Sequence, residues 1–244
     1  MKNVTELPDG TRIFWKSVTR NSNNVRLQIV GEAILTLGLI LLLFVGFKAL
    51  LQDSLISANQ SSIAKEYGSE NGKKQFRDPS KVNAQAQIFA RMYVPRFGND
   101  WTRLIAEGTR WHPVLNEIGV GHYIGTAMPG KVGNFAVAAH RGGFGGSFKE
   151  IHRLVEGDKV YVETNKYWYV YKYLQTKIVS PQDVSVIRPV PGELKGSHPG
   201  GRYMTLTSCT PIFVNTDRIV VWLELDKVLS IRKGPPVELN LGGK

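Results

Sequence analysis

The only cysteine of this chain, Cys209, is the residue best suited to nucleophilic chemistry. It ends an apolar, β-type run at residues 203–209 (YMTLTSC) and is followed by Thr210 and Pro211. Because proline cannot donate a ladder hydrogen bond, we expect the strand to end here, with the thiol facing a loop. A substrate can reach a thiol in such a place, although a lone cysteine is more often a small buried apolar residue. The residues around Cys209 must show whether it is a nucleophile or a structural residue.

Arg218 follows nine residues later and begins a second apolar run at residues 218–225 (RIVVWLEL). Two strands joined by a loop of about eight residues can bring a cysteine at the end of one close to an arginine at the start of the next. A guanidinium stays charged, so it can favour a thiolate or neutralise an oxyanion without releasing a proton. Taken alone, Arg218 is more typical of a solvated strand end.

A cysteine nucleophile also needs a group that moves protons, and histidine is the usual one. His140 ends the apolar run at residues 134–139 (NFAVAA), and the glycines that follow it allow a tight turn and a close approach to a ligand. His122, within GVGHYIGT, is the second candidate, so position alone favours His140 only modestly. The remaining histidines have the pattern of surface residues: His112, His152 and His198.

The elements that position these residues begin after an apolar stretch at residues 29–47, which has one charge, Glu32, near its start. As a helix these 19 residues are about 28 Å long, enough to span a bilayer. Five basic residues precede the stretch and only Lys48 follows it before Lys65. The positive-inside rule therefore predicts a cytoplasmic segment at 1–28 and a transmembrane anchor at 29–48, with the rest of the chain outside.

Beyond the anchor, residues 49–85 are rich in Ser, Asn, Gln, Lys and Glu and predict a polar tether, partly helical. Short apolar runs separated by Gly, Pro and Asn then predict a mostly β domain at 86–230, a barrel or a sandwich, with a loose tail at 231–244. Two short helices are expected inside this domain, at residues 102–107 and 148–154.

Composition limits the partners. The 31 Lys and Arg residues against 20 Asp and Glu give a net charge of +11, which suits nucleic acid, anionic lipid or an acidic wall polymer. The basic residues are spread along the chain without a zinc-finger, Walker or RNA-binding motif, so a nucleic-acid partner is not predicted. One cysteine cannot form an internal disulfide, and no ligand set indicates a metal or another cofactor.

Three motifs together resemble the sortases: GVGHYIGTAMPGKVGNFAVAAHR, then TLTSC, then an arginine nine residues after the cysteine. The resemblance covers roughly residues 85–228, and the first motif looks most like the class E sortases of high-GC Gram-positive bacteria. It implies an eight-stranded β-barrel after the transmembrane helix. It also implies that His140, Cys209 and Arg218 match the catalytic His, Cys and Arg of the family.

The resemblance further implies a transpeptidase. The Cys209 thiolate attacks the threonine carbonyl of an LPxTG- or LAxTG-like sorting signal, His140 protonates the leaving glycine amine, and an amine of the lipid-linked peptidoglycan precursor resolves the thioester. Sorting-signal proteins, this precursor and the plasma membrane are then the expected partners. The enzyme would be single-pass, with its catalytic domain outside the cell.

Four residues are expected to bind substrate by this resemblance: Tyr123, Thr205, Leu206 and Ser208. Thr205 and Leu206 fit equally well as ordinary strand residues that hold Cys209, and Tyr123 as an aromatic packed on the barrel. Two positions depart from the family pattern. Ser208 replaces threonine in TLxTC, which leaves the sorting motif open, and Ile124 stands where proline is common.

Three alternatives remain. Pilin-polymerising sortases cover their site with an Asp-Pro-aromatic segment, but Ser80 follows Asp78 and Pro79 here, so this role is disfavoured. A hydrolytic cysteine protease would bring an Asn or Asp to orient its histidine and would place its cysteine at a helix N-terminus. A noncatalytic membrane-tethered barrel that binds wall polymer explains the charge and the anchor but leaves the three motifs to coincidence.

Overall fold

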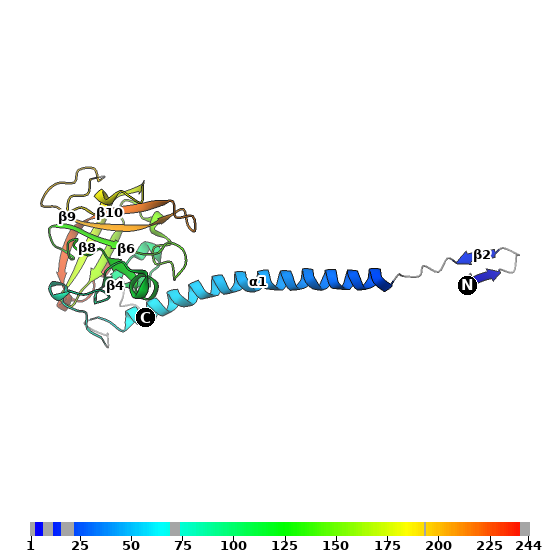
Figure 1. The fold of residues 1–244 in the computed structure, drawn as a ribbon. Coiled ribbons are helices and arrows are strands. Elements are labelled where there is room, and N and C mark those ends of the chain that lie inside the picture. The colour runs from blue at the N-terminus through cyan, green and yellow to red at the C-terminus, as the bar shows by residue number, and fades with distance from the viewer. Residues whose placement is uncertain (1–2, 7–11, 16–21, 69–73, 193, 240–244) are drawn as a thin grey trace. The chain divides into compact units, whose positions relative to one another are not determined.

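The fold is that of a computed structural model, which describes residues 3–6, 12–15, 22–68, 74–192 and 194–239 (Figure 1). The chain divides into two compact units, Met1–Leu50 and Leu51–Lys244. The first contains an antiparallel pair, β1 (Asn3–Glu6) and β2 (Arg12–Trp15), and the beginning of α1 (Ser22–Lys65). The other residues of the predicted cytoplasmic segment, 1–2, 7–11 and 16–21, lie outside the described residues.

Helix α1 includes the predicted anchor. Its residues Val25–Phe47 have a mean hydropathy of 2.4 and are long and apolar enough to cross a membrane. The helix continues to Lys65, so the predicted polar tether begins as helix. Gln60 and Ala64 are buried inside the second unit, to which this end of α1 belongs. Of the predicted tail, residues 231–239 include two 3-10 helices, and 240–244 lie outside the described residues.

The second unit is a closed eight-stranded barrel with the order β10-β8-β7-β3-β4-β5-β6-β9, which confirms the predicted fold. Neighbouring strands are antiparallel except for two parallel pairs, β4–β5 and β6–β9. Closure gives each of these eight described strands a neighbour on both sides, so the barrel has no edge strand for other chains to join. The strands are β3 (Ile88–Tyr93), β4 (Thr102–Glu107), β5 (Gly119–His122), β6 (Gly133–Ala138), β7 (Lys159–Glu163), β8 (Tyr167–Val179), β9 (Arg202–Thr210) and β10 (Asp217–Ser230).

Short helices connect the strands. One is a π-helical segment, η3 (Trp111–Ile118), which the sequence did not predict. The helix predicted at 148–154 is present only as the 3-10 helix η4 (Ile151–Arg153). The remaining 3-10 helices are η1 (Pro79–Lys81), η2 (Pro95–Phe97), η5 (Val184–Ile187), η6 (Ile231–Lys233) and η7 (Val237–Leu239).

The helix predicted at residues 102–107 is wrong, because this segment is β4. Every residue of β4 is buried, so the run lacks the alternation of a half-exposed strand. Its polar side chains have partners inside the protein: Arg103 donates to serine hydroxyls and Glu107 bonds to His122. Burial on both faces thus hid the two-residue period.

Large aromatic and aliphatic side chains fill the barrel, among them Phe89, Phe135 and Leu206. Phe135 is 1% exposed and lies against the rings of Phe89, His122 and Tyr171. We expect Phe135→Ala to lower the free energy of unfolding by about 3–5 kcal/mol, measured by chemical denaturation, because a cavity replaces the ring. Phe213→Ala, at a side chain that is 81% exposed, should change it by no more than about 0.5 kcal/mol. Equal effects of the two substitutions would contradict the packing described.

Candidate active site

Strands β9 and β10 bring Cys209 and Arg218 together. The two strands are antiparallel neighbours, and Cys209 is the direct cross-strand partner of Arg218. Both side chains are partly buried. The guanidinium of Arg218 donates through Nη1 to the carbonyl oxygens of Asn215, at 3.2 Å, and Asp217, at 2.9 Å. It is therefore held at the strand end by the backbone of the loop that joins the two strands.

Strand β6 places His140 at the same end of the barrel. Strands β6 and β9 run parallel, with Ala138 paired to Thr207 at the end of the ladder. The contact continues beyond the strand, because Ser208 Oγ donates to the carbonyl oxygen of Ala139 at 2.7 Å. Two residues past the last pair, the same register brings His140 level with Cys209. The candidate nucleophile, histidine and arginine thus lie at one end of three adjacent strands, β6, β9 and β10.

Two aromatic rings and an amide side chain surround the imidazole of His140. Its ring lies 5.2 Å from that of Phe144 and 6.2 Å from that of Trp111. Its Nε2 is 2.8 Å from Asn116 Oδ1, and Asn116 Nδ2 is 3.0 Å from His112 Nε2. Since an amide oxygen only accepts, Nε2 of His140 has the proton, and Nδ1 is left to exchange one.

Sequence reasoning missed Asn116. It lies in η3, a segment without apolar alternation, and precedes His140 by 24 residues. An asparagine that orients the histidine was expected to mark a hydrolytic protease. Here the amide is present while Cys209 ends a strand instead of beginning a helix. An asparagine that orients the histidine therefore does not by itself distinguish a hydrolytic protease from a sortase-like transpeptidase.

A second arginine, Arg141, directly follows His140. It is buried, and its Nη1 donates to Thr210 Oγ1, next to Cys209. Two guanidinium groups are thus attached to residues that adjoin the thiol, one through Thr210 and the other across the β9–β10 ladder. Fixed positive charge at this end of the barrel favours negative charge on a reacting sulfur or oxygen.

The pKa of His140 is lowered from its ordinary value of 6.5, because burial disfavours the charged imidazolium; Asp53 acts in the opposite direction. We expect an NMR titration of the ring to have a midpoint below 6.5, and Asp53→Asn to lower it further. The unfolded chain then binds this proton more tightly, so His140 makes the folded state less stable below pH 6.5 than above it. Ser54→Ala, at an exposed neighbour on α1, should leave the midpoint unchanged. A midpoint that Asp53→Asn raises would contradict this account.

His122, the second candidate, lies inside the barrel and is 1% exposed. Its Nδ1 is 2.7 Å from Glu107 Oε2 and its Nε2 is 2.8 Å from Thr126 Oγ1. Both ring nitrogens are therefore engaged by structural partners. The remaining histidines are placed as follows: His112 bonds Asn116 and Glu117, His152 lies on η4, and His198 lies beside Pro199.

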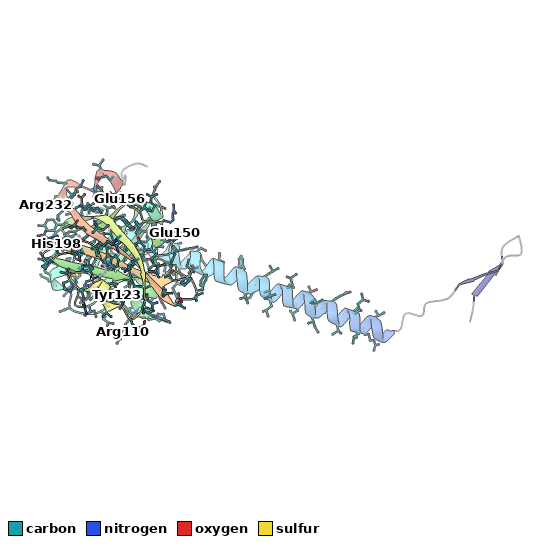
Figure 2. The ribbon with its side chains drawn as sticks, turned by 90° about the horizontal axis from the view of Figure 1, so that it is seen from above. Arg110, Tyr123, Glu150, Glu156, His198 and Arg232 are labelled. Carbon is teal, nitrogen blue, oxygen red and sulfur yellow. The ribbon has the colours of Figure 1, made fainter. Side chains whose placement is uncertain are left out.

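Three of the four predicted substrate contacts are buried, at no more than 3% exposure: Thr205, Leu206 and Ser208. Thr205 Oγ1 donates to Asn134 Oδ1 and Ser208 Oγ to Ala139, while Leu206 belongs to the core. In this state they join β6 to β9 and so hold Cys209 level with His140. Tyr123, labelled in Figure 2, is partly exposed and its hydroxyl is 3.0 Å from Thr207 Oγ1.

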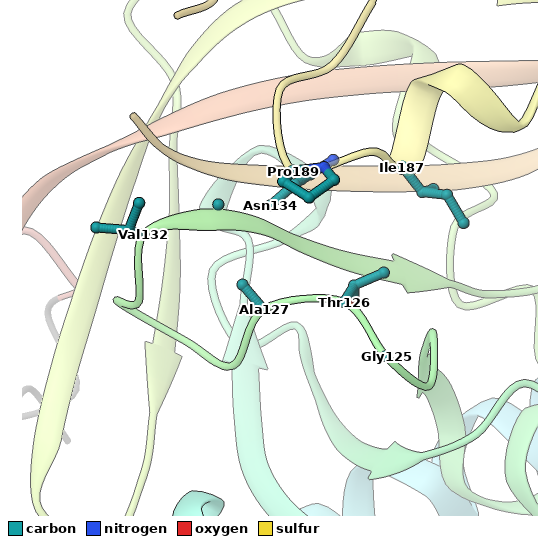
Figure 3. Close-up of a pocket in the computed structure, with 8 residues that line it drawn as sticks. Gly125, Thr126, Ala127, Val132, Asn134, Ile187 and Pro189 are labelled. Atoms are coloured by element: carbon teal, nitrogen blue, oxygen red, sulfur yellow. The ribbon is translucent and has the colours of Figure 1, made fainter. Parts of the chain in front are cut away.

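A hollow of about 250 Å³ lies beside the start of β6 (Figure 3). The turn at residues 125–127 forms one wall, and Ile187 and Pro189 form the other. Asn134 fixes the second wall, because its Nδ2 donates to the carbonyl oxygens of Val186 and Arg188. Nothing in the described part of the chain groups three or more His, Cys, Asp or Glu side chains for a metal ion.

Known proteins match this chain over most of its length. A profile of the sortase domain matches residues 92–226. Sortase SrtE1 of Streptomyces coelicolor is 36% identical over 86% of this chain, which spans about 60% of that relative's length. Sortase SrtE2 of the same organism is 30% identical over 87% of this chain and 88% of its own.

Solved structures agree. The crystal structure of sortase E1 from Streptomyces coelicolor is 40% identical and covers 63% of this chain and 98% of that chain, with a TM-score of 0.58. Three observations indicate the same family: the strand order of the barrel, the motifs around His140 and Cys209, and the profile match at residues 92–226. The chain belongs to the sortase family, and class E sortases of Streptomyces are among its relatives.

Proposed function

We propose that this chain is a cysteine transpeptidase that cleaves an LPxTG- or LAxTG-like sorting signal between Thr and Gly and joins the threonine to a cell-wall amine. One observation supports this most strongly. Cys209 pairs directly with Arg218 across β9–β10, and the β6–β9 register brings His140 level with the thiol. A nucleophile, a proton carrier and a fixed cation then share one end of the barrel.

The proposed reaction has two steps. The thiolate of Cys209 attacks the threonine carbonyl, the C–N bond to glycine breaks, and His140 gives its proton to the leaving amine. Arg218 neutralises the oxyanion that forms in between. An incoming amine then attacks the thioester, His140 takes up its proton, and the thiolate leaves. The hydrogen bond from Nε2 to Asn116 leaves Nδ1 of His140 as the atom that exchanges this proton.

The hollow beside β6 is proposed to take the N-terminal part of the signal. Asn134, at its edge, lies six residues before His140, about 20 Å along an extended strand. A five-residue signal in extended form is about 17 Å long, a few Å short of this distance, so the N-terminal end of the signal and the residues that precede it extend toward the hollow while its threonine meets Cys209. Tyr123 lies between the two and is the proposed contact for the signal. The sortase E1 structure holds a tripeptide in its active site, which supports a peptide as the ligand proposed here.

The membrane arrangement follows from α1. We place Val25–Phe47 across the plasma membrane with the N-terminus in the cytoplasm, because basic residues gather before this span. The barrel then lies outside the cell. There it meets sorting-signal proteins as they leave the membrane and the lipid-linked peptidoglycan precursor that supplies the amine.

Polymerisation of pilin remains disfavoured. Asp78 pairs with Lys166 at 2.7 Å, in the turn between β7 and β8. In the β8–β10 ladder, Tyr167 faces Ser230 while Val179 faces Arg218, so this turn lies at the opposite end of the ladder from Arg218. The Asp78–Pro79 segment is thus held away from the thiol and does not cover it.

The test uses the full chain in detergent micelles with fluorogenic LAxTG and LPxTG peptides, with and without an amine acceptor, and mass spectrometry of the products. Cleavage between Thr and Gly together with ligation to the amine supports the transpeptidase and ranks the signals. Hydrolysis alone, with the amine ignored, would indicate a protease instead. A folded chain that cleaves neither peptide between pH 6 and 9 would favour the noncatalytic barrel.

A further inference from the structure

The C-terminal end of α1, residues 53–64, contacts the two segments that surround His140. Gln60 is the centre of this contact and is 1% exposed. Its Nε2 donates to the carbonyl oxygens of Asn116 and Phe144, each at 3.2 Å, and its Oε1 accepts from Ser147 Oγ at 3.1 Å. One side chain of α1 thus joins η3 to the loop that follows β6.

The two carbonyl groups belong to residues that touch the imidazole. Asn116 accepts a hydrogen bond from Nε2 of His140, and the Phe144 ring packs against the imidazole at 5.2 Å. Gln60 therefore fixes the backbone on both sides of His140 without touching it. A loss of these bonds would release both neighbours at once.

The fit at Gly145 shows how closely the helix approaches this loop. Asp53 Oδ1 accepts a hydrogen bond from the Gly145 amide at 2.8 Å. A Cβ at Gly145 would lie 2.8 Å from Gln60 Oε1 and 3.1 Å from the Ser57 amide nitrogen, and its φ is +81°. Only glycine combines this backbone conformation with this approach. The loop after His140 is shaped to receive the helix.

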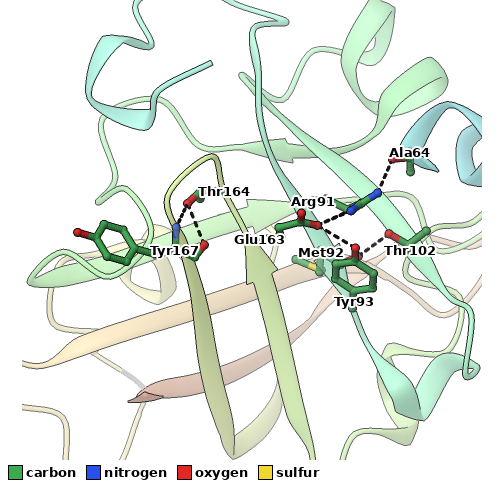
Figure 4. Close-up of polar contacts among 8 residues, drawn as sticks. All are labelled: Ala64, Arg91, Met92, Tyr93, Thr102, Glu163, Thr164 and Tyr167. Atoms are coloured by element: carbon green, nitrogen blue, oxygen red, sulfur yellow. Dashed lines mark hydrogen bonds and ion pairs between the residues drawn. The ribbon is translucent and has the colours of Figure 1, made fainter. Parts of the chain in front are cut away.

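Two arginines of the barrel, one buried and one partly buried, hold the same end of α1. Arg103, 2% exposed, donates to the hydroxyls of Ser57 and Ser61, both at 2.6 Å. Burial lowers its pKa to about 10, which leaves it charged at neutral pH, and a buried charge needs hydrogen-bond partners of this kind. Arg91 pairs with Glu163 and donates to the carbonyl oxygen of Ala64 at 2.9 Å, where a cation complements the helix C-terminus (Figure 4).

We propose that residues 53–64 of α1 form a positioning element of the active site, with Gln60 as the positioning residue for His140. The inference rests on the proposed role of His140 in proton transfer. As a consequence, the helix that contains the candidate membrane span also holds the His140 imidazole in position. A domain cut after this segment would lose the support on both sides of the imidazole.

The test compares three variants of the full chain in detergent micelles. Gln60→Ala is expected to lower kcat about tenfold while KM stays within about twofold, because a displaced proton carrier affects the chemical step more than binding. Gln60→Glu keeps the side-chain volume but places a carboxylate against two carbonyl oxygens, so its kcat should fall by about as much. Asn59→Ala, at the exposed neighbour, is the matched control and should change neither constant.

A second readout does not depend on turnover. In the histidine-labelled full chain, the His140 ring signal, assigned with His140→Gln, should shift or broaden in both Gln60 variants and not in Asn59→Ala. If the wild-type chain cleaves no sorting peptide but this signal moves, the positioning stands and the proposed function fails. A folded Gln60→Ala with unchanged kcat and an unchanged ring signal would overturn the inference. Should Gln60→Ala not fold, Gln60→Asn, which keeps the amide but shortens its reach to the two carbonyl oxygens, decides by the same two readouts.

Discussion

Replacing Cys209 with alanine is expected to reduce cleavage of a sorting peptide by about 10⁴-fold or more. Cys209 is the only thiol of the chain, so no other sulfur can form the thioester. Its neighbours, in contrast, stay in place, because β9 is held by the buried contacts of Thr205 and Ser208. The variant should therefore keep the thermal unfolding midpoint of the wild type.

The measurement is peptide turnover by the full chain, with product identities from mass spectrometry. Cys209→Ser is the conservative partner variant. It replaces the thiol with a hydroxyl of similar size that is a far weaker nucleophile, so this variant should be nearly as inactive as the alanine variant. Residual turnover above about one per cent in the folded alanine variant would mean that another residue attacks the peptide.

Replacing Arg218 is expected to have the second largest effect. Arg218→Ala should lower kcat about 10²–10³-fold, because the oxyanion loses its fixed cation. Arg218→Lys should recover little, since an ammonium lacks the planar, two-pronged donor geometry of a guanidinium. The loss should fall mainly on kcat if the interaction forms in the transition state.

The control for Arg218 lies at the other end of the same ladder. Arg202 begins β9, is exposed, and pairs with Gly133 at the start of β6. Arg202→Ala removes the same charge from the barrel away from the thiol and should leave kcat within about twofold. A kcat within threefold of wild type for Arg218→Ala would contradict the assigned role.

Much of the site could be anticipated from local patterns. Pro211 predicted where β9 ends, and β9 does end at Thr210, which leaves Cys209 next to a loop. The run beginning near Arg218 predicted the facing strand, and the two residues are cross-strand partners. These predictions succeeded because proline and a short antiparallel connection act locally in sequence.

The rest depended on tertiary burial. Residues 102–107 were predicted as helix because both faces of β4 are covered, which removes the alternation that identifies a strand. Residues 53–64 looked like a polar tether, yet Ser57, Gln60 and Ser61 are polar because they meet buried groups of the barrel. Only the folded chain shows that these side chains have such partners.

Asn116 illustrates the same limit at the site itself. Its side chain reaches His140 from η3, 24 residues earlier in the chain, and no local pattern distinguishes it from a surface amide. Thr205 and Ser208 show the converse. Their motif resembles a family signature, while their hydroxyls bond inside the barrel. A motif can thus reflect the positioning of a nucleophile as much as contact with a substrate.

The most direct test of the account is intact-mass spectrometry of the full chain incubated with an LAxTG peptide and no amine acceptor. The account predicts that the chain gains the mass of the peptide fragment ending in threonine, as an acyl group on Cys209. Addition of an amine should remove the adduct and yield the ligated peptide. A peptide cut between Thr and Gly with the adduct on another residue, or with an adduct also in Cys209→Ala, would contradict it.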